Sequence, residues 1–154
     1  MGMTLGLALD GYIPISIFPR WNFVLLAMNQ LINHLDKVNI MSNNGFKVKT
    51  IVRTGVGSQR PLHPQHQHIG DFTDMVRKMC TSIDVIKLNE PEDIFPSYKK
   101  ALNREDGKST ILVEFGDYHN EKYPFFQLLD KLLFNYAETN PKDNDYLDEA
   151  KKIK

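Results

Sequence analysis

The sequence predicts an α/β fold, a three-layer arrangement in which an open, mostly parallel sheet carries helices on both faces. The main observation is that apolar runs rich in β-branched residues alternate along the chain with segments whose apolar residues recur at helical spacing. With 154 residues and 42% hydrophobic content, the chain is also long enough to bury one good core. Strands that alternate with helices imply crossover connections, and therefore parallel strands.

Short apolar runs give the predicted strands, which cover residues 12–18, 48–53, 83–88 and 109–115. The first of them ends at Pro19 and is expected to be a buried strand. The longest predicted helix runs from Trp21 to about Asn39, because apolar residues recur through it at helical spacing. Further helices are expected over residues 69–80, from Pro91 to Leu102, and over residues 120–136, followed by a frayed polar tail.

The long helix has a polar stripe opposite its apolar face, formed by Asn29, Asn33 and either Asp36 or Lys37. Taken by itself, this stripe indicates a solvated face. The single cysteine, Cys80, has no nearby second cysteine and no basic neighbours in sequence, which indicates a buried thiol rather than a nucleophile.

Composition excludes several classes of function. Lys+Arg and Asp+Glu are equal at 19 each, so nothing suggests a nucleic-acid partner. Near-zero net charge favours self-association. The longest apolar stretch is well short of the ~18 residues that a membrane span needs. The start of the chain lacks the pattern of a signal peptide, so a cytoplasmic protein is expected.

The long segment from Gly55 to His68 is rich in Gly, Pro and His, and loops of this length are usually functional. His63, His66 and His68 lie within it at spacings of three and two. Three interpretations stay open: surface or hydrogen-bonded histidines, which carry most of the weight, a transition-metal site, or histidines that act on a substrate.

Aromatic residues mark the junction between the first strand and the long helix, namely Phe18, Trp21 and Phe23. This is the carboxyl end of a parallel strand, where open α/β sheets bind ligands. The alternative is that these aromatic side chains pack in the core. Arg20, beside them, either pairs with an anion or is solvated.

Several stretches together carry a resemblance to a known family. They are residues 6–15, with small residues followed by a glycine turn and an apolar run, then residues 27–33, Met41-Ser42, Val52-Arg53 and His66. At these spacings the chain resembles the pyrimidine-binding domain of the transketolase superfamily. The closest likeness is to the β subunit of the first component of 2-oxo acid (pyruvate) dehydrogenase. The resemblance extends to about Leu102 and departs from the family at Ile17, Arg20 and Gln67-His68.

The resemblance implies the thiamine-diphosphate-binding fold. Residues 1–118 would form a pyrimidine-binding domain that lacks its first strand, and residues 119–154 a C-terminal helix and tail. His66 would serve catalysis on the substrate side, and Phe18, Trp21 and Phe23 would form the pyrimidine wall. No metal ligand is expected in this chain, because magnesium and the diphosphate belong to a separate domain with a Gly-Asp-Gly motif, which is absent here. The family's catalytic glutamate would lie upstream of Met1.

These implications lead to a functional hypothesis and a rival. The chain is expected to be a component of a thiamine-diphosphate-dependent 2-oxo acid dehydrogenase or transketolase-like enzyme, contributing the aminopyrimidine side of the cofactor site and inactive alone. Its partners would be a second copy, an α-type subunit that binds the diphosphate, or both, and its substrate a small 2-oxo acid or ketose. The rival is a non-catalytic dimerising or regulatory module on the same fold.

Overall fold

The computed structural model describes residues 1–57 and 63–117. Contacts within the chain divide it into two compact units, Met1–Asn120 and Glu121–Lys154. Only the first unit is described below, so the helix expected over residues 120–136 and the tail beyond it lie outside the described residues. Within the described part of the chain, no helix is both long and apolar enough to cross a membrane.

Helices and strands alternate along the described chain, as the sequence predicts. In order they are α1 (Gly2–Leu9), β1 (Ile15–Ile17), α2 (Trp21–Val24), η1 (Leu25–Ala27), η2 (Asn29–Leu35), α3 (Val38–Met41), β2 (Ile51–Val56), η3 (His66–His68), α4 (Thr73–Met79), β3 (Asp84–Lys87), η4 (Pro91–Asp93), α5 (Ile94–Leu102) and β4 (Thr110–Phe115).

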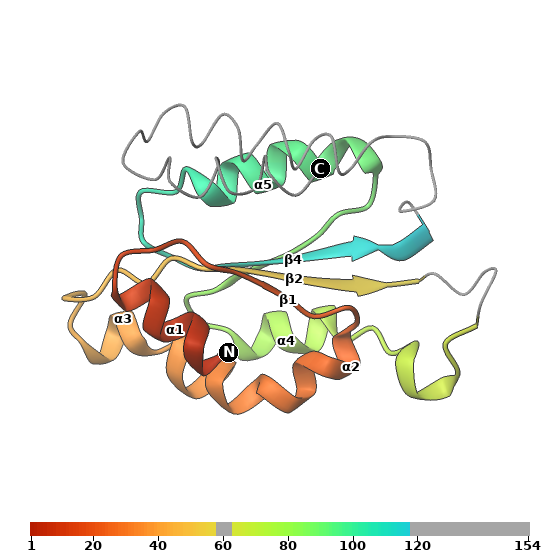
Figure 1. Ribbon diagram of the computed structural model, residues 1–154, viewed down its shortest axis with the longest axis horizontal. Coiled ribbons are helices and arrows are strands. Elements are labelled where there is room, and N and C mark those ends of the chain that lie inside the picture. Colours follow the sequence, from red (N-terminus) through yellow and green to blue (C-terminus); the bar gives the residue numbers. More distant parts are fainter. Residues whose placement is uncertain (58–62, 118–154) are drawn as a thin grey trace, which may run out of the picture. The chain divides into compact units, whose positions relative to one another are not determined.

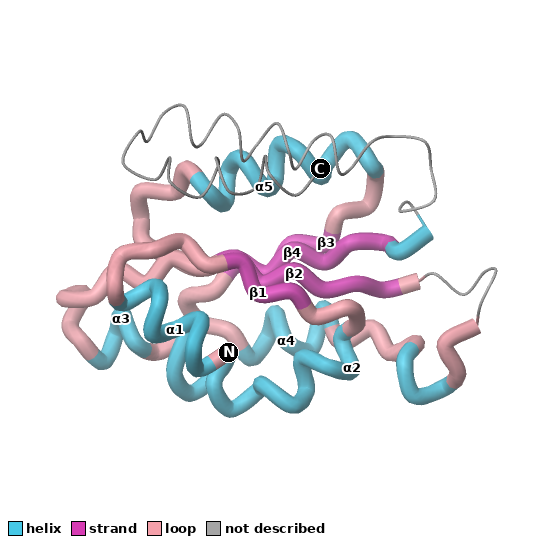
Figure 2. Tube along the Cα trace, in the orientation of Figure 1, coloured by secondary structure: helices cyan, strands magenta, loops and turns pink. Residues whose placement is uncertain are grey.

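The strands form one sheet in the order β1-β2-β4-β3, and all its pairings are parallel. α5 lies on one face of this sheet, and α1, α2, α3 and α4 lie on the other (Figures 1 and 2). The predicted α/β class and the open parallel sheet with helices on both faces are therefore confirmed. Because all strands run the same way, their carboxyl ends meet at one edge, where ligands bind in such sheets.

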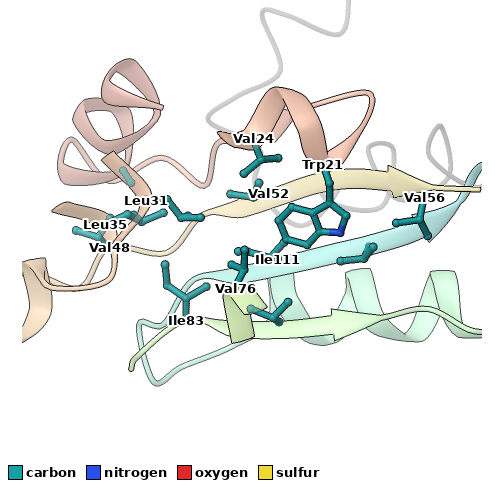
Figure 3. Close-up of a cluster of buried hydrophobic side chains, with 13 residues drawn as sticks. Trp21, Val24, Leu31, Leu35, Val48, Val52, Val56, Val76, Ile83 and Ile111 are labelled. Atoms are coloured by element: carbon teal, nitrogen blue, oxygen red, sulfur yellow. The ribbon is translucent and has the colours of Figure 1, made fainter. Parts of the chain in front are cut away.

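The larger part of the core lies between the sheet and the helices on the α1 side (Figure 3). Trp21 and Val24 from α2, and Val76 from α4, are fully buried there against Val52 and its neighbours on the strands. On the other face, α5 buries a smaller apolar set, with Ile51 and Leu112 on the strands and Tyr98 and Ala101 on the helix. Burying apolar side chains on both faces is what stabilises a parallel sheet.

β1 corrects the prediction of a long buried first strand. It spans only three residues, at the end of the sheet, and its side chains are exposed at Ile15 (38%) and Ile17 (61%). Tyr12, expected in the same strand, precedes it and is also exposed. An apolar run rich in β-branched residues indicates a strand but cannot say whether that strand is central or at an edge.

The long helix predicted from Trp21 to about Asn39 is one helical run from Trp21 to Met41, but its hydrogen-bonding pattern changes along it. The middle segment, η2, is a π-helix, and directly after it the Asp36 amide donates to the Leu31 carbonyl five residues earlier at 2.9 Å. A wider turn rotates every later side chain relative to a regular α-helix. The expected faces are wrong at two points: Asp36, directly after η2, is fully buried, and Leu26, in the 3₁₀ segment η1 before η2, is 86% exposed.

The buried Asp36 carboxylate fixes this helix to the segment before β3. It accepts hydrogen bonds from the backbone amides of Thr81, Ser82 and Ile83 at 2.8–3.0 Å, and from the Lys37 ammonium at 2.8 Å. Burial alone would raise the pKa of Asp36, but the hydrogen bonds from Lys37, Ser82 and Thr81 outweigh burial and hold the pKa well below its usual range. Asp36 is thus a structural anion.

Candidate functional site

The carboxyl edge of the sheet gathers residues that are far apart in sequence. Phe18 and Arg20 follow β1, Gly57 follows β2, and Phe115 ends β4. Gly55, the next-to-last residue of β2, lets the β1 end approach closely, because a Cβ there would lie 3.0 Å from the Pro19 carbonyl oxygen. The chain from β1 into α2 therefore passes over the end of β2, which positions α2 and its aromatic side chains at this edge.

The predicted aromatic wall divides into a buried part and an exposed part. Trp21 is fully buried in the core, and its indole N–H donates to the Thr73 hydroxyl at 3.0 Å. Phe18 is half-buried and packs against the same core. Phe23 is 38% exposed, and it is the ring of this set that the structure offers at the surface. The role of these aromatic residues in holding a cofactor stays a prediction.

The structure brings Phe23 together with His68. Their rings stack with centroids 5.1 Å apart and an interplanar angle of 13°. His66 is exposed at the start of η3, and its ring meets the edge of the exposed His63 ring at 6.4 Å. The catalytic role predicted for His66 stays a prediction, but the histidine that contacts the predicted wall is His68. Sequence spacing alone could not distinguish the two.

One nitrogen of His68 is an orphaned polar atom. Its Nδ1 is buried and has no hydrogen-bond partner among the described residues. The Oδ1 atom of Asn22, the residue between Trp21 and Phe23, is in the same condition. Buried polar atoms are rarely left unpaired, so each of these atoms calls for a ligand or an ordered water. Within the described part of the chain, no group of three or more His, Cys, Asp or Glu side chains is placed to hold a metal ion.

Arg20 fastens the histidine segment to the sheet. Its Nη1 donates to the Gly57 carbonyl at 2.7 Å and to the His68 carbonyl at 3.2 Å. The sequence left Arg20 open between an anion partner and solvent, and the structure shows these two backbone acceptors among its contacts. Gly57 has φ +72°, and a Cβ there would lie 2.7 Å from an Asp117 carboxylate oxygen, so glycine is required at this turn.

Replacing Arg20 by leucine is expected to loosen η3 while leaving the sheet intact, because charge-assisted hydrogen bonds to two carbonyls are lost. The expected cost is about 1–3 kcal/mol of unfolding free energy. Hydrogen exchange measured by mass spectrometry should show faster exchange in residues 63–70 and unchanged exchange in β2 and β4. Lysine at this position restores a charge without the forked donors and should recover only part of the protection. Unchanged exchange in residues 63–70 would refute the role given to Arg20.

A second polar group lies near the start of α4. The Asp71 carboxylate accepts hydrogen bonds from the Thr73 amide at 3.0 Å and from the Lys87 ammonium at 2.7 Å. Burial raises the pKa of Asp71, but the bonds from Lys87 and Thr73 outweigh burial and lower the pKa overall. The Lys87 ammonium also lies 5.0 Å from the centroid of the Phe115 ring. The Asp71 carboxylate is therefore already hydrogen-bonded to Thr73 and Lys87 within the chain.

A buried triad lies under α5 near the same ends of β2 and β4, and sequence reasoning missed it. The Arg53 guanidinium binds one oxygen of Glu114 through Nε at 2.9 Å and Nη2 at 2.6 Å, and the Tyr98 hydroxyl donates to the other at 2.5 Å. Glu114 is 1% exposed. Burial and then the Glu114 charge raise the pKa of Tyr98 far above its usual range, so the phenol stays a donor. The signal in the sequence was Glu114 itself, because an ionisable residue within an otherwise apolar predicted strand is expected to be buried with a partner.

Cys80 agrees with the interpretation of an unreactive thiol. Burial, and then the nearby Asp36 charge, raise the pKa of Cys80 to about 11. The thiol therefore stays protonated near neutral pH, whereas a nucleophilic cysteine is usually found with a lowered pKa.

The fold is an α/β fold with an open parallel sheet, and the stacked Phe23 and His68 rings lie at its carboxyl edge. No protein-family model matches the chain. It is 28% identical over 123 residues to "Pyruvate dehydrogenase E1 component subunit beta, mitochondrial" of Ascaris suum, a match that covers 80% of this chain and 33% of the relative. It is 26% identical over 147 residues to "Pyruvate dehydrogenase E1 component subunit beta" of Staurastrum punctulatum, covering 95% of this chain and 38% of the relative.

Over shorter stretches the identity is higher. The chain is 33% identical over 66 residues to "Pyruvate dehydrogenase E1 component subunit beta" of Gracilaria tenuistipitata var. liui, a match that covers 43% of this chain and 20% of the relative. The similarities support the relationship to the transketolase superfamily and to a component of 2-oxo acid dehydrogenases. The chain spans about a third of the length of the curated relatives that it matches over most of its own sequence.

Proposed function

We propose that this chain contributes the aminopyrimidine side of a thiamine-diphosphate site to a 2-oxo acid dehydrogenase or transketolase-like assembly, and that an α-type subunit holds the diphosphate and its magnesium. The observation that carries the proposal is the stacked Phe23–His68 pair at the carboxyl edge of a parallel sheet. The chain that presents this pair is similar over most of its length to pyruvate dehydrogenase β subunits.

The residues at the carboxyl edge offer the types of contact that an aminopyrimidine ring needs, namely aromatic stacking and hydrogen bonds. Phe23 offers a partly exposed aromatic ring, and the Nδ1 of His68 and the Oδ1 of Asn22 are polar atoms that need a partner. An aminopyrimidine has a flat ring to stack and both donors and acceptors at its rim. When bound, thiamine diphosphate supplies the carbanion chemistry of such enzymes at the carbonyl of a 2-oxo acid or ketose.

In this proposal the chain binds and orients the aminopyrimidine ring, and a partner supplies the rest of the cofactor site. Phe23 and His68 position the ring, Arg20 holds η3 in place, and His66, exposed at the start of η3, is the candidate for moving a proton on the substrate side. Asp71 and Glu114 are engaged with Lys87 and Arg53, so neither offers a spare carboxylate next to Phe23. The proposal therefore takes the catalytic carboxylate from outside the described residues, and it expects the chain to be inactive alone.

Calorimetric titration with thiamine diphosphate and magnesium tests this function, with and without an α-type subunit of pyruvate dehydrogenase. Binding is expected only in the presence of that subunit. Phe23→Ala and His68→Ala should each weaken it by up to about tenfold, the value of one aromatic contact. Phe46→Ala is the matched control, because Phe46 is also exposed but precedes β2 at the opposite end of the strands. No binding by the folded chain with the subunit present would sink the proposal.

The rival is a non-catalytic dimerising or regulatory module, and one observation favours it. Trp21 is fully buried, and Arg20 donates to a carbonyl of the chain itself. Two residues at the carboxyl edge are therefore engaged within the fold rather than presented to a cofactor. The same titration separates the two functions. A chain that binds the α-type subunit but gives no heat with the cofactor is a module of this second kind.

A further inference from the structure

Four side chains form a continuous series of hydrogen bonds that runs from the core to the surface at the carboxyl edge, and we call it the indole relay. The Trp21 indole N–H donates to the Thr73 hydroxyl at 3.0 Å, and that hydroxyl donates to Oδ1 of Asp71 at 2.5 Å. The Lys87 ammonium donates to Oδ2 of the same carboxylate at 2.7 Å. Trp21 is buried in the core (Figure 3), whereas the Asp71 side chain is 39% exposed. The relay therefore joins α2, the start of α4 and the end of β3.

The chemistry of its members gives the relay a single direction. An indole N–H and an ammonium can only donate, and an ionised carboxylate can only accept. Although burial raises the pKa of Asp71, the bonds from Lys87 and Thr73 lower the pKa overall, so this carboxylate is ionised near neutral pH. The Thr73 hydroxyl must therefore accept from Trp21 and donate its one hydrogen to Asp71. Serine is the replacement that keeps both bonds, and valine is the replacement of similar shape that removes both.

The indole relay closes a ring with the stacked Phe23–His68 pair. Phe23 lies two residues after Trp21 on α2, and His68 lies three residues before Asp71. The stack joins these two segments with ring centroids 5.1 Å apart, and the bond from Trp21 to Thr73 joins them a second time, inside the core. Breaking the inner connection is therefore expected to move the His68 ring relative to the Phe23 ring.

The same two segments carry the buried polar atoms that lack a partner among the described residues. Oδ1 of Asn22 belongs to the residue directly after Trp21, and Nδ1 of His68 lies on the other segment. A ligand that bonds to both atoms needs them at a fixed separation, because hydrogen bonds weaken steeply when distance or angle departs from the preferred range. The relay connects the two segments that set this separation.

We propose that Thr73 and Asp71 are positioning residues, which hold His68 against Phe23 through the indole relay and so set the geometry of the predicted aminopyrimidine site. Arg20 holds the carbonyl of His68 itself, and the relay holds the chain three residues further on. A binding site is held in its productive geometry by such supporting hydrogen bonds behind the residues that contact the ligand. The effect on the stack depends only on bonds within the chain, whereas the effect on cofactor binding rests on the function proposed above.

Proton NMR of the full chain tests the effect on the stack without any cofactor. The ring current of a benzene ring shifts the protons of an imidazole stacked on it upfield, so one of the five histidines should show a shift that Phe23→Leu abolishes. Thr73→Val should move this signal toward its position in Phe23→Leu, because the inner connection is lost. Thr73→Ser keeps both bonds of the hydroxyl and should leave the signal in place.

Thr50→Val is the matched control for Thr73→Val. Thr50 is also a buried threonine, but its hydroxyl has no hydrogen-bond partner among the described residues, so the histidine signal should not move. Fluorescence of the single tryptophan reports the first bond of the relay. The emission should shift to shorter wavelength in Thr73→Val, where the indole N–H loses its acceptor, and should stay unchanged in Thr73→Ser and in Thr50→Val.

Asp71→Asn is a second variant, which decides the outcome if Thr73→Val does not fold. The amide keeps an acceptor for the Thr73 hydroxyl but loses the charge that binds Lys87, so the histidine signal should move in the same direction by a smaller amount. Circular dichroism identifies the variants that keep the fold. A folded Thr73→Val, or failing that a folded Asp71→Asn, whose histidine signal coincides with that of the wild type overturns the positioning role.

A double-mutant cycle on cofactor binding tests whether the relay acts through the stack. With thiamine diphosphate, magnesium and an α-type subunit, Thr73→Val should weaken binding less than Phe23→Ala does, and should have no further effect in a Phe23→Ala background. Additive losses would overturn the positioning role and leave the proposed function in place. If the wild type binds no cofactor while the histidine signal still moves in Thr73→Val, the proposed function fails and the role of the relay in holding the stack stands.

Discussion

Asp36→Ala is expected to lower the free energy of unfolding by about 3–5 kcal/mol, among the largest effects of any single change in the described chain. The carboxylate is fully buried and accepts hydrogen bonds from the consecutive amides of Thr81, Ser82 and Ile83. Without it, these amides lose their acceptor, and an unsatisfied amide that is buried, as at Ile83, costs about 1–3 kcal/mol. Urea unfolding followed by circular dichroism measures the change.

Asp74→Ala is the matched control for Asp36. Asp74 forms an ion pair with Arg77 on α4, but its side chain is 85% exposed, so the expected loss is about 0.5 kcal/mol or less. If Asp36→Ala costs no more than this exposed pair, the clamp between the helix and the segment before β3 does not stabilise the fold.

The same residue predicts how stability depends on pH. The pKa of Asp36 is lower in the folded chain than its ordinary value of about 3.8, so the folded state binds this proton more weakly than the unfolded state does. Its contribution is therefore fully present above about pH 5 and is lost as the pH falls through 4 toward the folded pKa. In urea titrations between pH 7 and pH 3, Asp36→Asn should flatten this acid decline. An equal decline in both proteins would contradict the assignment.

The sequence predicted the alternation of strands and helices well, because local apolar patterning decides it. It failed at Asp36, which directly follows a π-helical segment, and at Leu26, which lies in a 3₁₀ segment before it. Residue periodicity does not predict either change in the helical hydrogen-bonding pattern. It also failed to place β1 at an edge. Strand order depends on pairings between distant segments, which periodicity does not record.

The candidate site was predicted at the carboxyl edge of the sheet, and the structure adds contacts there that the sequence did not give. The aromatic residues after β1 and the histidine segment do meet, yet the contact joins Phe23 to His68, 45 positions apart in the sequence. Arg20 donates to two backbone carbonyls, contacts that the sequence did not predict. Spacing along the chain identifies candidates, whereas their contacts depend on how loops cross the strand ends.

Glu114→Gln is the second substitution for which a large effect is expected, about 3–5 kcal/mol of unfolding free energy, because it leaves the Arg53 charge facing a neutral amide in a largely buried place. Although burial opposes the charge on Arg53, the hydrogen bond and charge of Glu114 raise the pKa of Arg53. In the variant that support is gone, but arginine keeps its proton even when buried, so the guanidinium cannot escape the cost by losing its charge. Thermal and urea unfolding of the single variant measure the loss.

A double substitution tests whether the Arg53–Glu114 pair adds net stability, or whether each charge only compensates for burial of the other. Arg53→Met with Glu114→Leu replaces both charges by apolar side chains, and removing both ions together removes their desolvation cost as well as their attraction. With Tyr98→Phe added, so that no hydroxyl is left without an acceptor, stability is expected to return to within about 1 kcal/mol of the wild type. A triple variant as unstable as Glu114→Gln would instead mean that the ion pair contributes net stability at the carboxyl edge of the sheet.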